Sequence, residues 1–143
     1  MSRSVRYVLD ANVGLKIGLP ERNSDKAIQL QADFRSGIHE LIAPDFFPVE
    51  LGHALTRSVR KLLIPVGQAM SLFDNIMDPC PALHPSMPFL PMAIEMSSQT
   101  RASVFDILYL LLAEDQDCPF VTADRRIKSA FPNESRIIDL SAL

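Results

Sequence analysis

The sequence predicts an α/β fold, with a central parallel sheet of about four to five strands flanked by helices. Short β-branched runs alternate with longer segments of helical periodicity along the whole chain. This alternation is typical of strand–helix–strand units, which produce parallel strands joined by right-handed crossovers. Since the chain has 143 residues, the length of one average domain, we expect a single domain over residues 1–143.

The first half of the chain supplies two of the expected strands and a pair of adjacent helices. Its opening run is β-branched and apolar, which favours a strand. Apolar residues then recur at steps of three and four, first between Pro20 and Gly37 and later on both sides of Pro65. The last two helices are expected to form a hairpin on one side of the sheet. The expected elements are strands at Val5–Leu9 and Leu41–Ala43 and helices at Glu21–Arg35, Phe46–Leu62 and Pro65–Met77.

The second half begins with a segment rich in proline. Pro79–Pro91 contains five of the eleven prolines, so we expect a loop there with a short edge strand near Leu83. One later helix is apolar on nearly all sides and is therefore expected to be buried. The remaining elements are helices at Met92–Gln99, Ser103–Glu114 and Asp124–Ala130 and strands at Pro119–Thr122 and Arg136–Leu140.

Composition and charge exclude several classes of protein. Apolar residues make up 48% of the chain and charged residues 22%, which is typical of a folded domain. The longest apolar run, Ile107–Ala113, is too short to cross a bilayer, and no apolar leader precedes the first strand, so we expect a cytoplasmic protein without membrane contact. Two distant cysteines, Cys80 and Cys118, argue against a disulfide scaffold or a cysteine zinc site. The net charge of −3 argues against nucleic-acid binding over the whole surface, but it is compatible with a local basic rim around an acidic site.

Four acidic residues stand out because they occur in apolar surroundings. Asp10 ends the first strand, and Asp124 follows the fourth strand by two residues. The carboxyl ends of parallel strands line the ligand crevice of such a sheet, so these side chains can converge. Asp106 lies near the start of the buried helix, and Glu50 lies at the edge of its own helix's apolar face. Four clustered carboxylates repel one another and therefore raise one another's pKa. A bound Mg²⁺ or Mn²⁺ ion removes this repulsion.

Each of these acids also has a structural interpretation. Asp10 can cap a helical turn at Asn12–Ile17, Asp124 can cap its short helix, and Ser103 with Asp106 fits a capping box. Glu50 can be a solvated residue at the edge of its helix. Capping is compatible with catalysis, but it does not explain why acids recur at one edge of the sheet.

The segments that carry the acids resemble the four motifs of the PIN domain, in particular those of compact VapC-like toxins from bacterial toxin–antitoxin pairs. The motifs occur in the family's order over nearly the whole chain. The resemblance implies a PIN-like three-layer sandwich and an endoribonuclease dependent on Mg²⁺ or Mn²⁺, with Asp10, Glu50, Asp106 and Asp124 as its acids. The matching segments are Tyr7–Val13 (YVLDANV), Pro44–Leu51 (PDFFPVEL), Ser103–Glu114 (SVFDILYLLLAE) and Phe120–Ile127 (FVTADRRI).

The chemistry of RNA hydrolysis assigns a role to each acid. Asp10 and Asp106 are the expected direct metal ligands, and Asp124 completes the site or binds a second ion. Glu50 binds metal or orients the attacking water. In-line attack of this water would leave a 5′-phosphate and a 3′-hydroxyl without using the RNA 2′-hydroxyl.

Residues beside the acids are expected to assist them. Asn12 and Thr122 are expected to hold the carboxylates in place through hydrogen bonds. Arg125 and Arg126 follow Asp124 directly and are candidates for contacts with RNA phosphates. A separate basic cluster at Arg57–Lys61 fits a solvated helix face better.

The resemblance also implies a cognate antitoxin, and we expect a homodimer. The helical hairpin carries more apolar residues than one face of a sheet needs, so it is expected to offer a groove beside Glu50. An Arg or Lys of the antitoxin would then reach the acids. Alternatively, these residues pack the hairpin onto the sheet or form the dimer. The expected lining residues are Phe46, Phe47, Leu62, Leu63, Met70 and Phe73.

A second class of function stays open on the sequence. The chain can be a catalytically silent PIN-fold binding module that acts through protein or RNA interactions and keeps its acids for structure. RNA cleavage that depends on a divalent ion distinguishes the two hypotheses.

Overall fold

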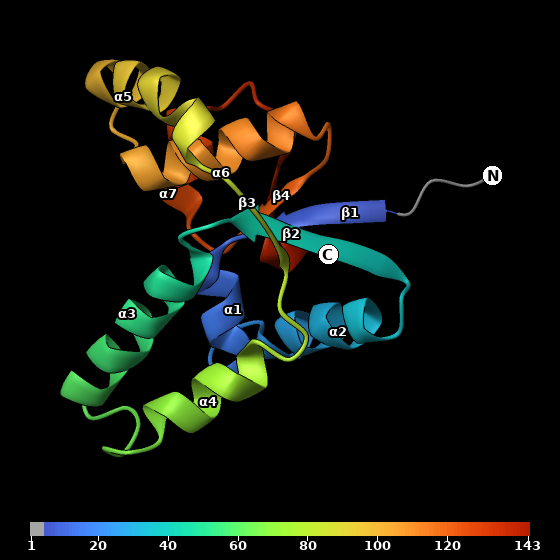
Figure 1. Cartoon of the computed structure of the whole chain (residues 1–143), viewed down its shortest axis with the longest axis vertical. Coiled ribbons are helices and arrows are strands. Elements are labelled where there is room, and N and C mark those ends of the chain that lie inside the picture. The colour runs from blue at the N-terminus through green and yellow to red at the C-terminus, as the bar shows by residue number, and fades with distance from the viewer. Residues whose placement is uncertain (1–4) are drawn as a thin grey trace.

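The computed structural model describes residues 5–143, which form a five-stranded parallel sheet between two layers of helices (Figure 1). The strand order is β3-β2-β1-β4-β5, and every neighbouring pair is parallel. The predicted three-layer α/β fold is therefore confirmed. Residues 1–4, which belong to the single domain expected over 1–143, lie outside the described residues. The strands are β1 (Val5–Leu9), β2 (His39–Pro44), β3 (Ala82–His84), β4 (Phe120–Thr122) and β5 (Ile137–Asp139).

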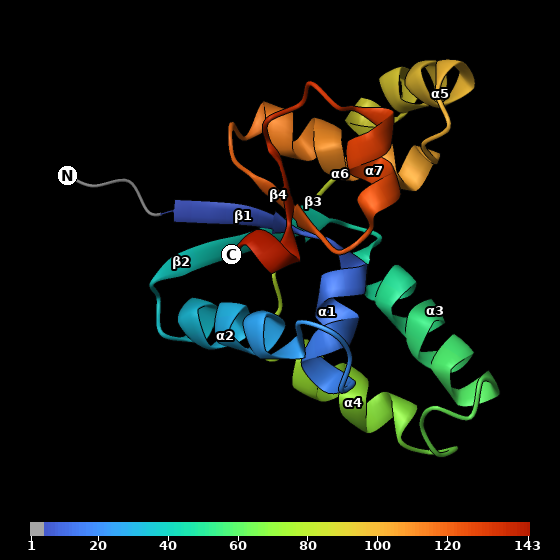
Figure 2. The same ribbon diagram turned by 180° about the vertical axis from the view of Figure 1, so that it is seen from behind.

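The helices divide between the two faces of the sheet. Helices α1 to α4 lie on one face and α5 to α7 on the other, as the two opposite views show (Figures 1 and 2). Short 3-10 turns lie at Met87–Phe89 and Leu140–Ala142. The helices are α1 (Ala11–Gly18), α2 (Ser24–Arg35), α3 (Phe47–Arg60), α4 (Ala69–Ile76), α5 (Leu90–Gln99), α6 (Val104–Asp115) and α7 (Arg125–Ala130).

Two helices begin later than the sequence predicts. Helix α2 starts at Ser24 instead of Glu21, because Asn23 takes a left-handed conformation with φ of 66° and Ser24 accepts a hydrogen bond from the Glu21 N–H. Helix α4 starts at Ala69, so the prediction that it begins at Pro65 is wrong. Gly67 has a φ of 94°, which no right-handed helix contains, and it ends a separate turn after Pro65.

The main core covers both faces of the sheet: it includes residues of α1 to α4 on one side and of α6 and α7 on the other. A smaller cluster joins α5 to α6. Helix α6 is buried along most of its length, as predicted from its apolar sequence. Close packing of α1 on α3 depends on Gly14, where an added Cβ would lie 3.1 Å from Cζ of Phe47. Asp10 directly precedes α1 and Glu50 lies one turn beyond Phe47 on α3, so this contact joins the two helices next to these acids.

The expected edge strand is present in the described part of the chain, where the two cysteines can also be located. The short edge strand expected near Leu83 is β3, which lies at the margin of the sheet. Cys118 is buried and Cys80 is exposed, and both are free thiols. No helix within residues 5–143 is long and apolar enough to span a membrane.

Candidate active site

The four predicted acids meet at the carboxyl edge of the sheet. Asp10 follows β1 and Asp124 lies two residues past the neighbouring β4, while Glu50 and Asp106 lie in the first turns of α3 and α6. Their charges act on one another: Asp106 raises the pKa of Asp10 and of Glu50, and Asp124 raises the pKa of Asp106. The acids are thus neighbours, although in residues 5–143 no three His, Cys, Asp or Glu side chains stand close enough to hold a metal ion between them.

Asp10 is the buried member of the acid cluster. Its side chain accepts hydrogen bonds from the Thr122 hydroxyl at 2.8 Å and from the Asn12 backbone N–H at 3.2 Å, and the second bond caps α1. The pKa of Asp10 is raised from 3.8 to about 7, mainly by burial and also by the negative charges of Asp106 and Glu50, against the lowering effect of these two donors. Without a cation, Asp10 therefore holds its proton to a much higher pH than an ordinary aspartate.

Thr122 and Asn12 fasten the ends of β1 and β4 to each other. The Thr122 hydroxyl also accepts from the Asp124 backbone N–H at 3.1 Å and from Asn12 Nδ2 at 3.3 Å. Asn12 Oδ1 accepts from the Ala123 N–H at 3.0 Å. Thr122 thus donates directly to a carboxylate, whereas the Asn12 side chain does not and acts on Asp10 through Thr122. The network fixes the position of Asp10 relative to the start of α7.

Glu50 is held by a residue that the sequence analysis missed. The hydroxyl of Tyr109 donates to Glu50 Oε1 at 2.8 Å. Tyr109 is fully buried and stacks on Phe120 with a centroid separation of 5.4 Å. Burial raises the pKa of Glu50, and the bond from Tyr109 partly offsets this rise. Tyr109 follows Asp106 by three positions on α6, a spacing that puts both side chains on one face and is visible in the sequence.

The capping interpretation of three acidic segments is confirmed alongside their clustering. Ser103 is the N-cap of α6, and its hydroxyl accepts from the Asp106 N–H at 3.1 Å. Asp124 caps α7 by accepting from the Arg126 N–H at 3.0 Å, and Asp10 caps α1. Asp106 nevertheless has a raised pKa, caused mainly by burial. Capping positions these carboxylates without removing them from the cluster.

Asp124 differs from the other acids because it has a cationic partner. The Arg126 guanidinium donates to both of its oxygens, from Nε at 3.0 Å and from Nη2 at 2.8 Å. This bidentate pair lowers the pKa of Asp124. The charge of Arg126 also offsets part of the rise in the pKa of Asp106. Arg125 lies elsewhere and lines a small pocket with Lys16 and Arg22. The two arginines expected to bind RNA together therefore face different surroundings.

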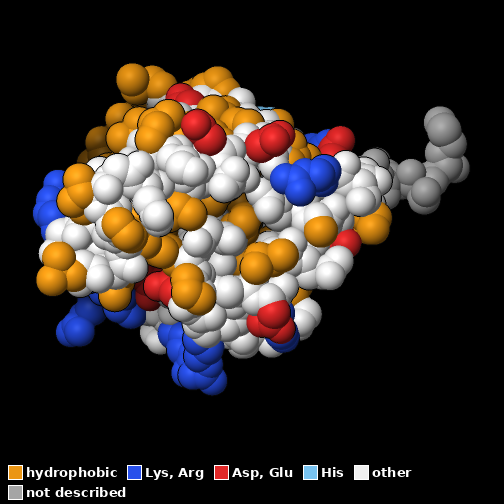
Figure 3. Space-filling model, turned by 90° about the horizontal axis from the view of Figure 1, so that it is seen from below, with side chains coloured by type: hydrophobic (Ala, Val, Ile, Leu, Met, Phe, Trp, Pro, Cys, Tyr) orange, Lys and Arg blue, Asp and Glu red, His pale blue; other side chains and the backbone are white. Residues whose placement is uncertain are grey.

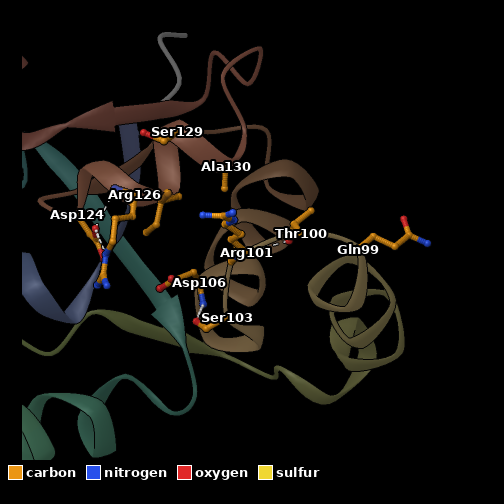
Figure 4. Close-up of a pocket in the computed structure, with 11 residues that line it drawn as sticks. Gln99, Thr100, Arg101, Ser103, Asp106, Asp124, Arg126, Ser129 and Ala130 are labelled. Atoms are coloured by element: carbon orange, nitrogen blue, oxygen red, sulfur yellow. Dashed lines mark hydrogen bonds and ion pairs between the residues drawn. The ribbon is translucent and has the colours of Figure 1, made fainter.

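A cleft of about 800 Å³ opens beside Asp106 and Asp124, between α7 and the turn that joins α5 to α6 (Figure 4). Arg101, on that turn, and Arg126 both line it. Arg101 is a second residue that the sequence analysis missed, because nothing in its local sequence relates it to the acids. The other lining residues include Gln99, Thr100, Ser103, Ile127, Ser129 and Ala130.

The groove expected along the α3–α4 hairpin is not formed by the predicted residues. Phe47 is fully buried, so its assignment to a surface groove is wrong: the side chain packs under Gly14 in the core. Phe46 is half-buried against the rings of Phe105 and Tyr109, and Phe73 also packs on the core. The exposed apolar residues lie at the far end of the hairpin, on the underside where Figure 3 shows apolar side chains among Lys and Arg. They are Leu62, Leu63, Val66 and Met70.

Comparisons with known proteins identify the family to which the chain belongs. Residues 7–130 match the PIN domain family. The chain is 35% identical to Ribonuclease VapC1 of Mycobacterium tuberculosis, from both the CDC 1551 and H37Rv strains, over 101 residues that cover 67% of this chain and 73% of the relative. It also shares its fold with PAE2754 from Pyrobaculum aerophilum, with a TM-score of 0.68, 20% identity and coverage of 98% of this chain and 94% of the other. The chain belongs to the PIN domain family.

Proposed function

We propose that this protein is the ribonuclease toxin of a toxin–antitoxin pair and that it cleaves RNA with the help of a divalent cation. One observation carries the proposal: four carboxylates from separate elements meet at the carboxyl edge of the sheet, and three of them have a raised pKa. A set of acids in this state is typical of a catalytic site. The identity with Ribonuclease VapC1 supports RNA as the substrate.

The donor set fits a hard divalent cation such as Mg²⁺ or Mn²⁺. It consists of carboxylate oxygens. Burial is the main cause of the raised pKa values of Asp10, Glu50 and Asp106, and the charge of a neighbouring acid raises each of them as well. Asp10, Asp106 and Asp124 would hold the ion. When bound, the cation would neutralise charge on the reacting phosphate and acidify the attacking water.

The chain's own residues would align the reaction. Tyr109 binds Oε1 of Glu50, which leaves Oε2 available to accept a proton from water. Thr122 and Asn12 keep Asp10 in a fixed orientation through the bonds between the strand ends. Arg126, already beside Asp124 and Asp106, can turn toward an RNA phosphate once a cation balances these acids.

We also propose an antitoxin partner and a homodimer. The exposed apolar end of the α3–α4 hairpin, Leu62 to Met70, lies beside the basic side chains of Arg57–Lys61 and fits an amphipathic segment of an antitoxin. A second exposed apolar set lies on β3, on the 3-10 turn at Met87–Phe89 and on α5. It fits contact between two copies of the chain, which sedimentation analysis tests. This set is Leu83, Met87, Met92 and Ile94.

Cleavage of a random-sequence RNA pool tests the activity. We expect the purified protein to cut the pool when Mg²⁺ or Mn²⁺ is added and to stop when the ion is chelated. Sequencing of the new ends should reveal 5′-phosphates. A catalytically silent binding module would bind the pool without cutting it under any ionic condition, and that result would contradict the proposed function.

A further inference from the structure

The cleft between α7 and the α5–α6 turn shares two walls with the acid cluster, through Asp106 and Asp124. We propose that this cleft binds the unpaired RNA nucleotide next to the cleaved bond and that Arg101 holds the phosphate of that nucleotide. This inference rests on the proposed ribonuclease function, and it states where on the protein part of the RNA substrate binds. A volume of about 800 Å³ lies within the range of pockets that enclose small molecules, which suits one nucleotide.

Arg101 is free to bind an anion. Among residues 5–143, no acidic side chain lies within ion-pairing distance of it, whereas Arg6, Arg126 and Arg136 are each paired with a carboxylate. Its side chain is exposed and extends between α6 and α7 in the direction of Ala130 (Figure 4). A planar guanidinium in this position can donate two parallel hydrogen bonds to a phosphate.

The turn that carries Arg101 is held by three hydrogen bonds. Thr100 donates its hydroxyl to the Met96 carbonyl at 2.9 Å and accepts from the Ala102 N–H at 3.3 Å. Ser97 donates to the Ala102 carbonyl at 2.9 Å, and Ala102 is itself buried. Because the backbone on both sides of Arg101 is fixed, the arginine base is already in place and loses little freedom when a ligand binds.

The remaining walls of the cleft suit a nucleoside better than an inorganic ion. Gln99, Ser103 and Ser129 offer hydroxyl and amide groups for a ribose or a base edge, and Ile127 and Ala130 offer apolar contact. The carboxylates of Asp106 and Asp124 repel phosphate, so the anion is directed to the arginine side of the cleft. With the acids on one side of the cleft and Arg101 on the other, a flanking phosphate binds at Arg101 while the bond to be cut lies at the acids.

Binding of RNA without cleavage tests the role of Arg101 directly. The probe is a fluorescein-labelled single-stranded RNA of mixed sequence, measured by anisotropy in EDTA. We expect Arg101→Gln to weaken binding about tenfold and to reduce the slope of log K against log salt concentration by about 0.7, the value for one lost phosphate contact on a single strand. Arg101→Lys should retain the salt dependence, since it keeps the charge.

The matched control is Arg60→Gln, which makes the same charge change at the far end of α3, about 15 Å along the helix from Glu50. It should leave both the affinity and the salt slope unchanged. Thermal melts establish that all variants are folded.

Kinetics separate this inference from the proposed function. In the presence of Mg²⁺, Arg101→Gln should raise KM about tenfold and leave kcat close to that of the unmodified protein. If the unmodified protein cleaves RNA and Arg101→Gln has unchanged affinity, salt slope and KM, the cleft assignment is wrong and the ribonuclease stands. An effect of Arg101→Gln confined to binding of a protein partner also overturns it. If the unmodified protein cuts no RNA, the ribonuclease proposal fails.

Discussion

The buried and the open halves of the acid site each contain an aspartate, but the two aspartates have different hydrogen-bond donors and opposite pKa shifts. Asp10, on the buried side, is bound only by the uncharged donors Thr122 and the Asn12 N–H, and its pKa rises to about 7. Asp124, on the open side, receives two bonds from the Arg126 guanidinium, and its pKa falls below the usual value. Both aspartates cap a helix and both follow a strand, so local structure does not explain the difference.

The contrast indicates which half of the site the proposed cation would stabilise more. Hydrogen bonds from neutral groups lower the pKa of a buried carboxyl but do not offset its lost hydration, so Asp10 stays partly protonated. Asp124 already has an internal cation and is ionised. The proposed divalent ion would therefore gain most by balancing Asp10, and it would compete with Arg126 for Asp124.

The largest expected effect comes from Asp10→Asn, which removes the charge of the buried half and keeps its shape. We expect kcat to fall about a thousandfold or more, because the metal loses its most enclosed ligand. The fold should persist, since Asn also caps helices well. The rate of RNA cleavage measures the effect, with Asp74→Asn on the exposed side of α4 as the control. Full activity of Asp10→Asn would falsify the metal-ligand assignment, and loss of activity through unfolding would make the residue purely a cap.

The next largest effect is on stability against pH in the absence of metal. Between pH 3.8 and about 7 the folded protein retains a proton on Asp10 that the unfolded chain has lost, so the free energy of unfolding falls as pH rises. We expect a loss of about 2–3 kcal/mol between about pH 5 and about pH 8 in the unmodified protein, relative to Asp10→Asn. Urea unfolding in EDTA measures it. Parallel pH profiles for the two proteins would show that Asp10 has an ordinary pKa.

Tyr109→Phe extends the comparison to Glu50, the other buried-side acid. The change removes one hydrogen bond from a carboxylate in a partly buried place, so the free energy of unfolding should fall by about 1–2 kcal/mol. The pKa of Glu50 should rise further, because the bond from Tyr109 now lowers it. Urea unfolding and an NMR titration of Glu50 report the two effects.

Tyr7→Phe is the matched control for Tyr109→Phe. Tyr7 is the only other tyrosine of the chain, and among the described residues its hydroxyl makes no hydrogen bond to an acid. If both substitutions change stability equally and neither shifts Glu50, the bond between Tyr109 and Glu50 has no role in the site.

The smallest expected effect is on the open half. Arg126→Gln removes the internal cation from Asp124, so Mn²⁺ should bind about threefold to tenfold more tightly, a modest change because the arginine is solvent-exposed. Electron paramagnetic resonance of free Mn²⁺ measures the affinity. Arg125→Gln makes the same charge change one residue away but lines a different pocket, so it should alter the affinity less. Equal shifts in the two variants would mean that net charge alone sets Mn²⁺ binding.

Local patterns in the sequence predicted the framework of the site. The first strand has the predicted bounds Val5–Leu9, and β3 occurs where the edge strand was expected. Asp10, Asp106 and Asp124 were locatable because each lies at a strand end or a helix start, where local sequence marks the boundary. Parallel pairing then brings these ends together, so adjacency follows from the fold class.

Side-chain partners were not predictable in the same way. Helical spacing puts Phe47 on an apolar face, but only the packing of α1 at Gly14 turns that position inward. The pairing of Arg126 with Asp124 depends on a rotamer choice, and Tyr109 reaches Glu50 across 59 positions of sequence. Such contacts depend on how whole helices and strands pack together. Hydrophobic periodicity and secondary-structure propensity do not contain this information.

The bond between Asp10 and Thr122 joins residues 112 positions apart, and this separation has a consequence for protein synthesis. A ribosome adds about 5–20 residues per second, so Thr122 is synthesised on the order of ten seconds after Asp10. The strand that completes the site, β4, follows β1, α3 and α6 in the chain, so it is made after the other elements that carry the acids. A nascent chain therefore has no assembled site until Thr122 and Asp124 have been synthesised.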